Sequence, residues 1–311
     1  MRIVSLIASA TEIVHELGLG RYQVGRSHEC DYPPEVKRLP QVTEPKFEPD
    51  GTSYEIDQRV KAILQEGLSV YRVHADKLDA LKPDVIITQS QCAVCAVSEM
   101  DVEEAVRQMV SSKPKIVSLE PNTLDDIFND IQKVAEALDV LTDGLRLTAT
   151  LRRRMDIIAE AARKVEREPR VACIEWIEPL MVAGNWMPTL VEMAGGENLF
   201  GEAGRHSPMI EWGTIREADP DILFVCPCGY SNEQTLAEMP SLSQLPGYAD
   251  LTAVKNNRVI VADGNRFFNR PGPRVVESLE ILAEIFHPDR FQFNHEGTGW
   301  LRYRETTDKN R

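Results

Sequence analysis

The chain has 311 residues, of which 42% are hydrophobic, and carries a formal net charge of −14. This length and composition are typical of a globular protein with one or two domains, and the negative charge argues against binding to nucleic acid or to anionic membrane surfaces. No apolar run approaches the length of a membrane span, so we expect a protein that is not inserted in a membrane.

The N-terminal sequence bears on where the protein works. Residues 2–10, directly after Met1, are mostly apolar and lack a separate basic region, so we read them as a strand and a turn rather than as a secretory signal peptide. On this reading the protein is cytoplasmic and its six cysteines are reduced thiols. If a signal peptide has been removed, the expected location is the periplasm or the cell surface.

Strands and helices alternate in the first part of the chain. Short apolar segments predict strands at 2–7, 24–26, 70–73, 85–88 and 116–119, with helices at 9–17, 52–64, 76–82, 98–110 and 124–138. Ser9 and Thr52 each precede a glutamate by three residues, which is the pattern of a capping box at a helix start, and Ser98 is expected to cap the helix that follows it. This alternation is typical of a parallel, doubly wound sheet.

Residues 142–166 predict one long helix, because apolar side chains recur along one stripe of it. These side chains are Leu145, Leu151, Met155, Ile158, Ala162 and Val165. Thr142 or Asp143 can cap its start, and Pro169 ends it. At about 1.5 Å per residue the helix measures roughly 35 Å, which is too long for a crossover between neighbouring strands. We therefore expect it to connect two lobes.

The alternation resumes after this helix. Strands are expected at 170–174, 180–183, 222–226 and 259–262, and helices at 188–194 and 274–286. The Lys-Pro-Asp sequence at 82–84 and the Asp-Pro-Asp sequence at 219–221 each precede a buried strand, so the two lobes have a similar build. The predicted fold class is α/β, with two Rossmann-like lobes of parallel sheet at 1–141 and 169–311. One long helix at 142–168 joins them, with a ligand cleft between the lobes.

Ligands of open parallel sheets bind beyond the carboxyl ends of the strands. The loops expected there contain His28, Tyr32, Trp176, Trp186, Tyr230, Phe267 and Phe268. Aromatic side chains offer large flat surfaces, so this set predicts a large planar or apolar ligand. The alternative is that the same aromatic side chains pack the loops onto the sheets.

Four segments resemble a known family. They are residues 3–12 (IVSLIASATE), 31–34 (DYPP), 182–200 (VAG followed by LVEMAGGENLF) and 267–274 (FFNRPGPR). In this order they are similar to the substrate-binding proteins of cobalamin and iron-siderophore ABC importers, and the resemblance extends to about Pro288. It implies two Rossmann-like lobes, a single connecting helix and a ligand held between the lobes. The segments at 31–34 and 267–274 favour cobalamin or a related corrinoid.

The resemblance also implies roles for particular residues. Tyr32 would face the corrin from the first lobe, and Trp186 and the two phenylalanines would face it from the second. Asn185, Asn269 and Arg270 could then hydrogen-bond its amide fringe. The full set of candidate ligand-binding residues is Ser9, His28, Tyr32, Gln91, Trp176, Asn185, Trp186, Tyr230, Phe267, Phe268 and Arg270. The implied partner is an ABC permease, whereas a cytoplasmic relative would act as a carrier or sensor. An iron-siderophore or haem ligand is the alternative within the same fold.

The cysteines leave three hypotheses open. Cys92 and Cys95 form a C-x-x-C pair that is typical of redox sites. A metal ion could instead bind a set made of His28, Cys30, Cys92, Cys95 and Cys228. The third hypothesis is ordinary packing of small apolar side chains, which we expect for Cys173 and Cys226 because both lie in predicted strands. His28 is also a candidate axial ligand to the cobalt of a bound corrin.

No pattern in the sequence predicts catalysis. The chain lacks the glycine-rich phosphate loops and the G-x-S-x-G nucleophile motif. Glu175 and Glu178 flank Trp176, yet nothing supplies a nucleophile with an orienting partner. We therefore expect a binding protein rather than an enzyme, with a cysteine-ligated metalloprotein or enzyme as the alternative from another class.

Overall fold

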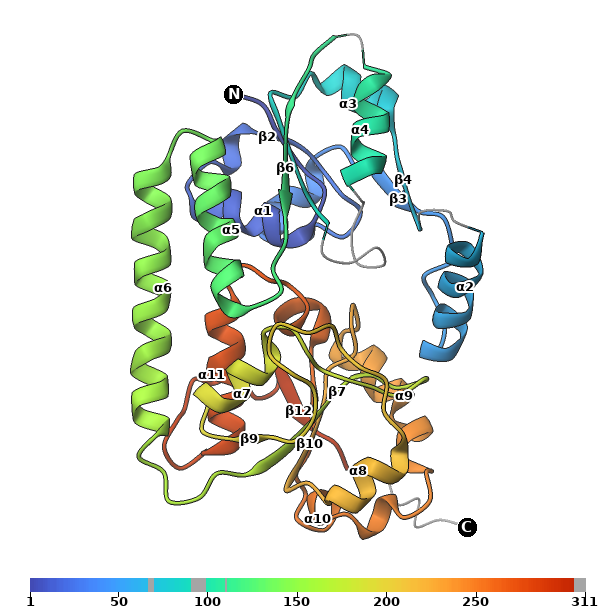
Figure 1. Cartoon of the computed structure of the whole chain (residues 1–311), viewed down its shortest axis with the longest axis vertical. Helices are drawn as coiled ribbons and strands as arrows, with labels where there is room; N and C mark the ends of the chain where they lie inside the picture. Colours follow the sequence, from blue (N-terminus) through green and yellow to red (C-terminus); the bar gives the residue numbers. More distant parts are fainter. Residues whose placement is uncertain (67–69, 91–98, 110, 305–311) are drawn as a thin grey trace. The chain divides into compact units, whose positions relative to one another are not determined.

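The computed structural model describes residues 1–66, 70–90, 99–109 and 111–304. Contacts divide the chain into two compact units. Unit 1 contains residues 1–51, 55–152 and 271–273, and unit 2 contains residues 52–54, 153–270 and the described residues from 274 onward. The chain can be followed from blue to red in Figure 1, and we describe each unit by itself.

Unit 1 is built on a four-stranded sheet with the strand order β2-β1-β5-β6, and all of its pairings are parallel. The parallel sheet predicted for this part of the chain is confirmed. Its strands are β1 (Ile3–Ser5), β2 (Gln23–Arg26), β5 (Val85–Gln89) and β6 (Lys115–Leu119). A separate antiparallel pair joins β3 (Thr43–Pro45) to β4 (Tyr71–Val73).

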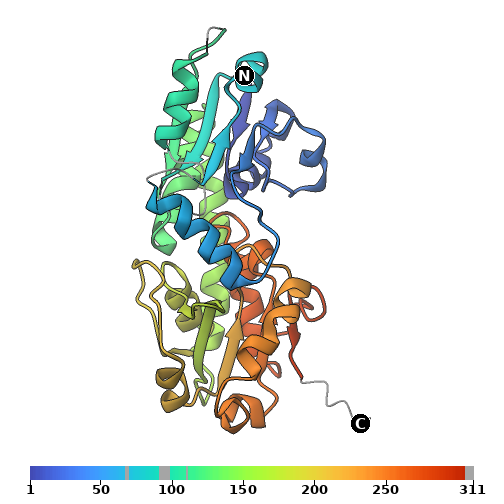
Figure 2. The ribbon, with the colours of Figure 1, turned by 90° about the vertical axis from the view of Figure 1, so that its right-hand side faces the viewer.

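Helices of unit 1 cover both faces of its sheet. They are α1 (Ala8–Glu16), α2 (Ser53–Gln65), α3 (Ala75–Leu81), α4 (Glu99–Arg107) and α5 (Leu124–Ala137), and α2 is the blue helix that is most easily seen in Figure 2. Val4 and Ile86 of the sheet share one apolar core with Val60 of α2, Leu78 of α3 and Val102 of α4. On the other face α1 contacts α5.

Unit 2 contains a six-stranded mixed sheet. Its strands are β7 (Arg170–Trp176), β8 (Met181–Val182), β9 (Glu197–Asn198), β10 (Ile222–Val225), β11 (Val259–Ala262) and β12 (Trp300–Arg302). The central strands β7, β10 and β11 are parallel, as predicted, whereas β8 and β12 are antiparallel to their neighbours. The segment between β7 and β8 is too short for the crossover that a parallel pair needs, so these two strands form a hairpin.

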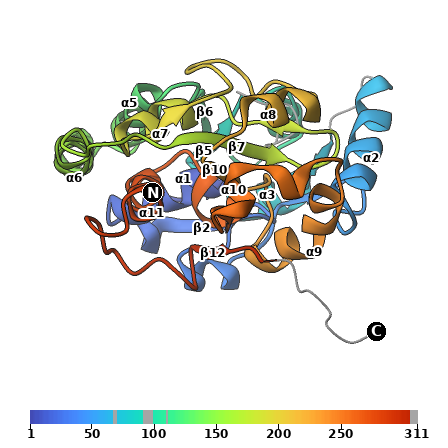
Figure 3. The ribbon, with the colours of Figure 1, turned by 90° about the horizontal axis from the view of Figure 1, so that it is seen from below.

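Helices also pack on both faces of the unit 2 sheet. They are α7 (Met187–Met193), α8 (Trp212–Ala218), α9 (Asn232–Ser243), α10 (Thr252–Lys255) and α11 (Val275–Phe286). Ile215 of α8 and Met239 of α9 pack with Ala172, Leu223 and Val259 of the sheet. In the view from below, α7 and α11 lie on the opposite side from α8 and α9 (Figure 3). The strands of this sheet therefore carry apolar side chains on both faces, which is the pattern of a buried sheet.

The long helix is present as α6 (Leu141–Ala162), and at about 1.5 Å per residue it measures roughly 33 Å. Thr142 and Asp143 lie inside it rather than capping it, because it begins directly after a turn in which Asp139 has a left-handed φ of 60°. It also ends earlier than predicted. The amides of Lys164 and Val165 bond back to carbonyls three residues earlier, which tightens the chain into a closing turn.

Neighbouring arginines attach α6 to a helix in each unit. In unit 1, Arg152 pairs with Asp125 of α5 at 2.7 Å, and its guanidinium lies 4.2 Å from the ring centroid of Phe128. In unit 2, Arg154 pairs with Glu280 of α11 at 2.8 Å. Figure 1 shows α5 alongside the first part of α6. The helix thus has one arginine contact within each unit, and its role as a connection stays a prediction.

Of the two predicted capping-box positions, the one at Ser9 is wrong. The helix α1 begins at Ala8 after an extended Ile7, so Ser9 lies inside the helix rather than at its N-cap. The helix α2 begins at Ser53, directly after Thr52, as the predicted boundary requires. Ser98, the third expected cap, lies outside the described residues.

Asp130 of α5 makes the stability of unit 1 depend on pH. Its carboxylate accepts a hydrogen bond from the Glu120 amide at 3.0 Å. Burial raises the pKa of Asp130 from 3.8 to about 7, and hydrogen bonding and Lys133 oppose the shift. The folded protein therefore holds this proton to a higher pH than the unfolded chain does. The contribution of Asp130 to the free energy of unfolding is greatest below pH 3.8 and is lost as the pH rises to about 7.

We therefore expect Asp130→Asn to stabilise the protein at pH 8 and to change little at pH 4. A pKa unit corresponds to about 1.4 kcal/mol, and with partial access of water we expect a gain of about 2 kcal/mol. Denaturant unfolding of both proteins at the two pH values measures this difference. Equal stabilities at pH 8 would contradict the role given to this carboxyl group.

Candidate functional site

The loop after β2 in unit 1 brings His28 against two other side chains. The Thr43 hydroxyl accepts a hydrogen bond from the His28 backbone N–H at 3.1 Å and lies 2.8 Å from Nδ1 of the ring. The ring centroid of Tyr71 is 5.1 Å from that of His28. Burial, followed by the nearby Arg26 guanidinium, lowers the pKa of His28 to about 4, and Glu44 opposes this shift. The imidazole is thus neutral at pH 7, and the neutral form is the one that ligates metals. Axial ligation of cobalt by His28 stays a prediction.

Cys30 belongs to a buried polar cluster at the carboxyl end of β1. Its Sγ lies 3.2 Å from Ser27 Oγ and 4.0 Å from Ser5 Oγ. Ser5 also hydrogen-bonds the Thr11 hydroxyl and accepts a hydrogen bond from Gln23 Nε2 at 2.7 Å. Burial raises the pKa of the Cys30 thiol. Cys30 is therefore a protonated interior thiol at neutral pH.

The other candidate ligand-binding residues of unit 1 differ in solvent exposure. Tyr32 is 36% exposed, so a ligand can reach its side chain. Ser9 is fully buried within α1, which removes its hydroxyl from the surface. Gln91, Cys92 and Cys95 lie outside the described residues.

In unit 2 the end of β7 and the loop after β10 place two aromatic side chains together. The ring centroids of Trp176 and Tyr230 are 5.4 Å apart, and the rings meet edge to face at 66°. Trp176 Nε1 donates a hydrogen bond to the carbonyl of Glu178 at 3.0 Å. The carbonyl of Tyr230 accepts one from the backbone N–H of Asn265, also at 3.0 Å. Three loops at the carboxyl ends of parallel strands are thus tied around a half-buried tryptophan.

A partly buried carboxylate, that of Glu175 in β7, holds the loop after β8. Ser207 Oγ donates a hydrogen bond to Glu175 Oε2 at 2.6 Å and accepts one from the Gly184 amide at 3.1 Å. Burial raises the pKa of Glu175, and the Ser207 hydrogen bond opposes this shift. Asn185 follows with a φ of 51°, a left-handed conformation that Asn tolerates better than most residues. Asn185 is partly exposed, whereas Trp186 is only 7% exposed.

The predicted aromatic pair after β11 is packed into its own unit. Phe268 is 1% exposed, and its ring centroid lies 4.9 Å from that of Phe224 in β10. The ring of Phe267 lies 4.7 Å from the Arg274 guanidinium, and Arg270 donates a hydrogen bond to Asn265 at 3.1 Å. These contacts match the alternative in which loop aromatics pack onto the sheet. We therefore do not retain Phe268 among the ligand-facing residues.

The described cysteines of unit 2 are mostly internal. Cys173 lies in β7 and Cys226 directly follows β10, and both are buried, as expected. Burial raises the pKa of Cys173 to about 12 and also raises that of Cys226. Cys228 is partly exposed, and its amide donates to the carbonyl of Glu175 at 3.0 Å. Across the described ranges no group of three or more His, Cys, Asp or Glu side chains is arranged to hold a metal ion. Because Cys92 and Cys95 lie outside those ranges, the predicted metal site stays a prediction.

Two residues of the site were not singled out from the sequence. Asn265 lies just after a predicted strand, so its position at a carboxyl end was a usable signal. Ser207 gave no such signal, because it is 32 residues from its partner Glu175.

Comparison with known proteins identifies the family. Residues 3–265 match the periplasmic binding protein family, and this chain belongs to it. In the part of the chain that the structure describes, none of the helices is both long and apolar enough to span a membrane.

Relatives and solved structures agree with this assignment. An uncharacterized ABC transporter substrate-binding lipoprotein of Bacillus subtilis is 21% identical over 94% of this chain and 81% of its own length. A vitamin B12-binding protein of Vibrio vulnificus is 23% identical over 92% of this chain and 89% of its own. The apo periplasmic haem-binding protein of Roseiflexus has 25% identity and a TM-score of 0.68, covering 92% of this chain and 98% of its own. The periplasmic vitamin B12-binding protein of Vibrio cholerae has 20% identity and a TM-score of 0.65, covering 94% and 98%.

These findings bear on several expectations. The resemblance to substrate-binding proteins and the two-lobe α/β fold are confirmed. The relatives are named for binding rather than for a reaction, which supports a binding role. Their names also describe a lipoprotein or periplasmic proteins, so they do not support the expectation of a cytoplasmic protein.

Proposed function

We propose that this protein binds cobalamin or a related corrinoid and presents it to an ABC permease for import. The observation that carries the proposal is the Trp176–Tyr230 pair, which lies where three strand-end loops of unit 2 are joined. A corrin has a wide apolar face and a fringe of amides. The exposed part of Trp176 suits the face, and Asn185 and nearby loop amides suit the fringe.

The choice of cobalamin rests on the relatives as well as on these loops. Vitamin B12-binding proteins match most of this chain, and the substrate-binding role of the family implies a small-molecule ligand and a permease partner. Within unit 1, Tyr32 is a candidate ligand contact, because the residue is 36% exposed. Haem is the second candidate ligand, since solved structures with the same fold are haem-binding proteins.

Trp176→Ala tests the site through ligand affinity. Removing the ring deletes one aromatic contact with the ligand, and we expect the Kd for hydroxocobalamin to rise about tenfold, as measured by titration calorimetry. Trp212→Ala is the matched control, because Trp212 stacks on Tyr248 in the core of unit 2 and donates to the Pro246 carbonyl. Equal affinities for wild type and Trp176→Ala, or equal losses in both variants, would argue against this site.

A further inference from the structure

Ser53, the first residue of α2, makes two hydrogen bonds within unit 2. Its side chain is buried, and its Oγ accepts a hydrogen bond from the backbone N–H of Glu178 at 3.0 Å. Its own backbone N–H donates to Glu238 Oε1 of α9 at 2.9 Å. Residues 52–54 are accordingly part of unit 2, although the rest of α2 belongs to unit 1.

Glu238 fixes where Ser53 lies. The first amides of a helix have no partner within the helix, and its N-terminus favours negative charge. The Glu238 carboxylate of α9 accepts from the first of these amides, that of Ser53, and places a negative charge at this N-terminus. Glu238 is only 8% exposed. The bond from Glu238 reaches the backbone of Ser53, so it persists when the Ser53 side chain is changed. The hydroxyl can therefore be removed without releasing the start of α2.

The hydroxyl of Ser53 acts on the loop that holds Trp176. Glu178 is the shared residue, since its amide donates to Ser53 Oγ and its carbonyl accepts from Trp176 Nε1 at 3.0 Å. These two bonds set the orientation of the Glu178 backbone and, through it, the plane of the indole. The indole in turn keeps its edge-to-face contact with Tyr230.

We propose that Ser53 is a positioning residue for ligand binding, which holds the Trp176 ring in its ligand-facing orientation through the backbone of Glu178. This inference rests on the proposed function and adds to it a residue that lies 123 positions before the tryptophan (176 minus 53). Ser53 itself does not touch the ligand.

Ser53→Ala in the complete chain tests the proposal. The variant loses one hydrogen bond to the loop, so we expect the Kd for hydroxocobalamin to rise about fivefold. Ser243→Ala is the matched control, because the Ser243 hydroxyl accepts from Tyr303 elsewhere in unit 2. We expect the unfolding midpoints of the two variants to be similar and the affinity of Ser243→Ala to equal that of wild type.

A double-mutant cycle separates positioning from general damage. If Ser53 acts through the indole, Ser53→Ala weakens binding in the wild-type background but changes little when Trp176 is already alanine. Additive losses would overturn the proposal, as would unchanged affinity of Ser53→Ala.

Fluorescence of the ligand-free protein tests the same contact independently. We expect Ser53→Ala to change the tryptophan emission spectrum, and we expect no such change in a Trp176→Phe background. An equal change in both backgrounds, or none in either, would overturn the role of Ser53. If wild type binds neither hydroxocobalamin nor haemin, the proposed function fails, while the emission comparison still decides whether Ser53 orients Trp176.

Discussion

Gly264→Ala is expected to lower the free energy of unfolding by about 3 kcal/mol, because the β10 and β11 loops approach each other too closely for a methyl group. A Cβ at position 264 would lie 2.1 Å from the carbonyl oxygen of Pro227 and 2.9 Å from that of Cys226. Both neighbours are backbone atoms, so neither can rotate away. The loops would have to separate, and the Asn265–Tyr230 hydrogen bond would be strained with them.

Urea unfolding measures this loss, and Gly213→Ala is the matched control. Gly213 lies in α8, and a Cβ there would have no atom within 4 Å. Alanine in a helix loses less conformational freedom on folding than glycine, so this control should be unchanged or more stable by up to about 1 kcal/mol. Wild-type stability for Gly264→Ala would show that the two loops tolerate a larger spacing.

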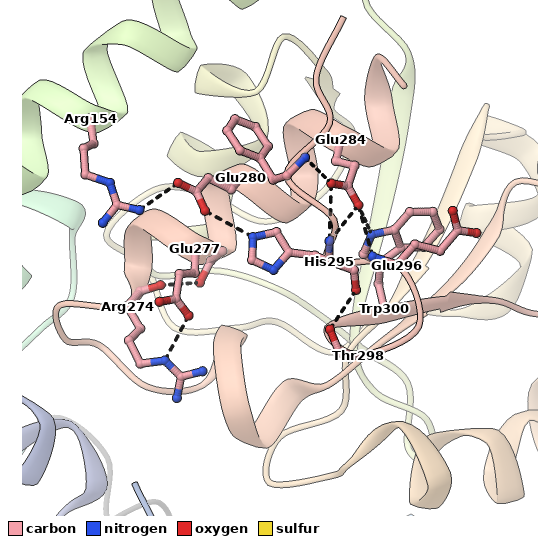
Figure 4. Close-up of polar contacts among 11 residues, drawn as sticks. Arg154, Arg274, Glu277, Glu280, Glu284, His295, Glu296, Thr298 and Trp300 are labelled. Atoms are coloured by element: carbon pink, nitrogen blue, oxygen red, sulfur yellow. Dashed lines mark hydrogen bonds and ion pairs between the residues drawn. The ribbon is translucent and has the colours of Figure 1, made fainter. Parts of the chain in front are cut away.

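Glu284→Ala is expected to lower the free energy of unfolding by about 3 kcal/mol or more, because it removes the hydrogen-bond acceptor for donors in residues 293–300. This carboxylate of α11 is 7% exposed. It accepts hydrogen bonds from the amides of Phe293 (2.6 Å), His295 (3.2 Å) and Glu296 (3.1 Å) and from Trp300 Nε1 (2.9 Å). Figure 4 shows His295, Glu296 and Trp300 around the Glu284 side chain. Without it the segment before β12 loses its anchor to α11.

Hydrogen exchange of residues 293–302, together with urea unfolding, measures the effect of Glu284→Ala. Glu296→Ala is a control within the same segment, because Glu296 is exposed and its carboxylate lies 3.6 Å from Arg302. Such surface pairs contribute at most about 1 kcal/mol. Similar protection and stability in both variants would contradict the anchoring role of Glu284.

The central strands were predictable from sequence because they are buried on both faces. The apolar sequence Val259–Ala262 forms β11 with the bounds predicted for it, and Ile222–Val225 forms most of the predicted strand. Helix ends were less predictable. Ile7 takes the extended conformation of the N-cap before α1, so Ser9 lies two residues too late to act as a cap.

Some elements were missed although the sequence contains a signal for them. The helix α9 opens with a capping box in which Ser231 and Gln234 each accept from the other's backbone N–H. Pro240 lies inside this helix and the apolar periodicity is weak, so the sequence pattern did not predict a helix there. The helix α8 is short and was missed as well.

The candidate site, like the fold, was only partly predictable from the sequence. Trp176 and Tyr230 could be placed at strand ends from the sequence, because loop positions follow from the strand pattern. Their mutual contact and the burial of Phe268 could not, since side-chain packing depends on residues distant in the chain. The hydrogen bond between Ser53 and Glu238 joins residues 185 positions apart, so no local sequence pattern predicts it.

Ligand retention is the measurement that tests the proposed function most directly. Purified protein is mixed separately with hydroxocobalamin, haemin and a ferric siderophore, passed through a desalting column, and examined by its visible spectrum. We expect the corrin spectrum to remain with wild type in a one-to-one ratio and to be reduced in Trp176→Ala. Retention of haemin or of the siderophore without retention of the corrin would contradict the account.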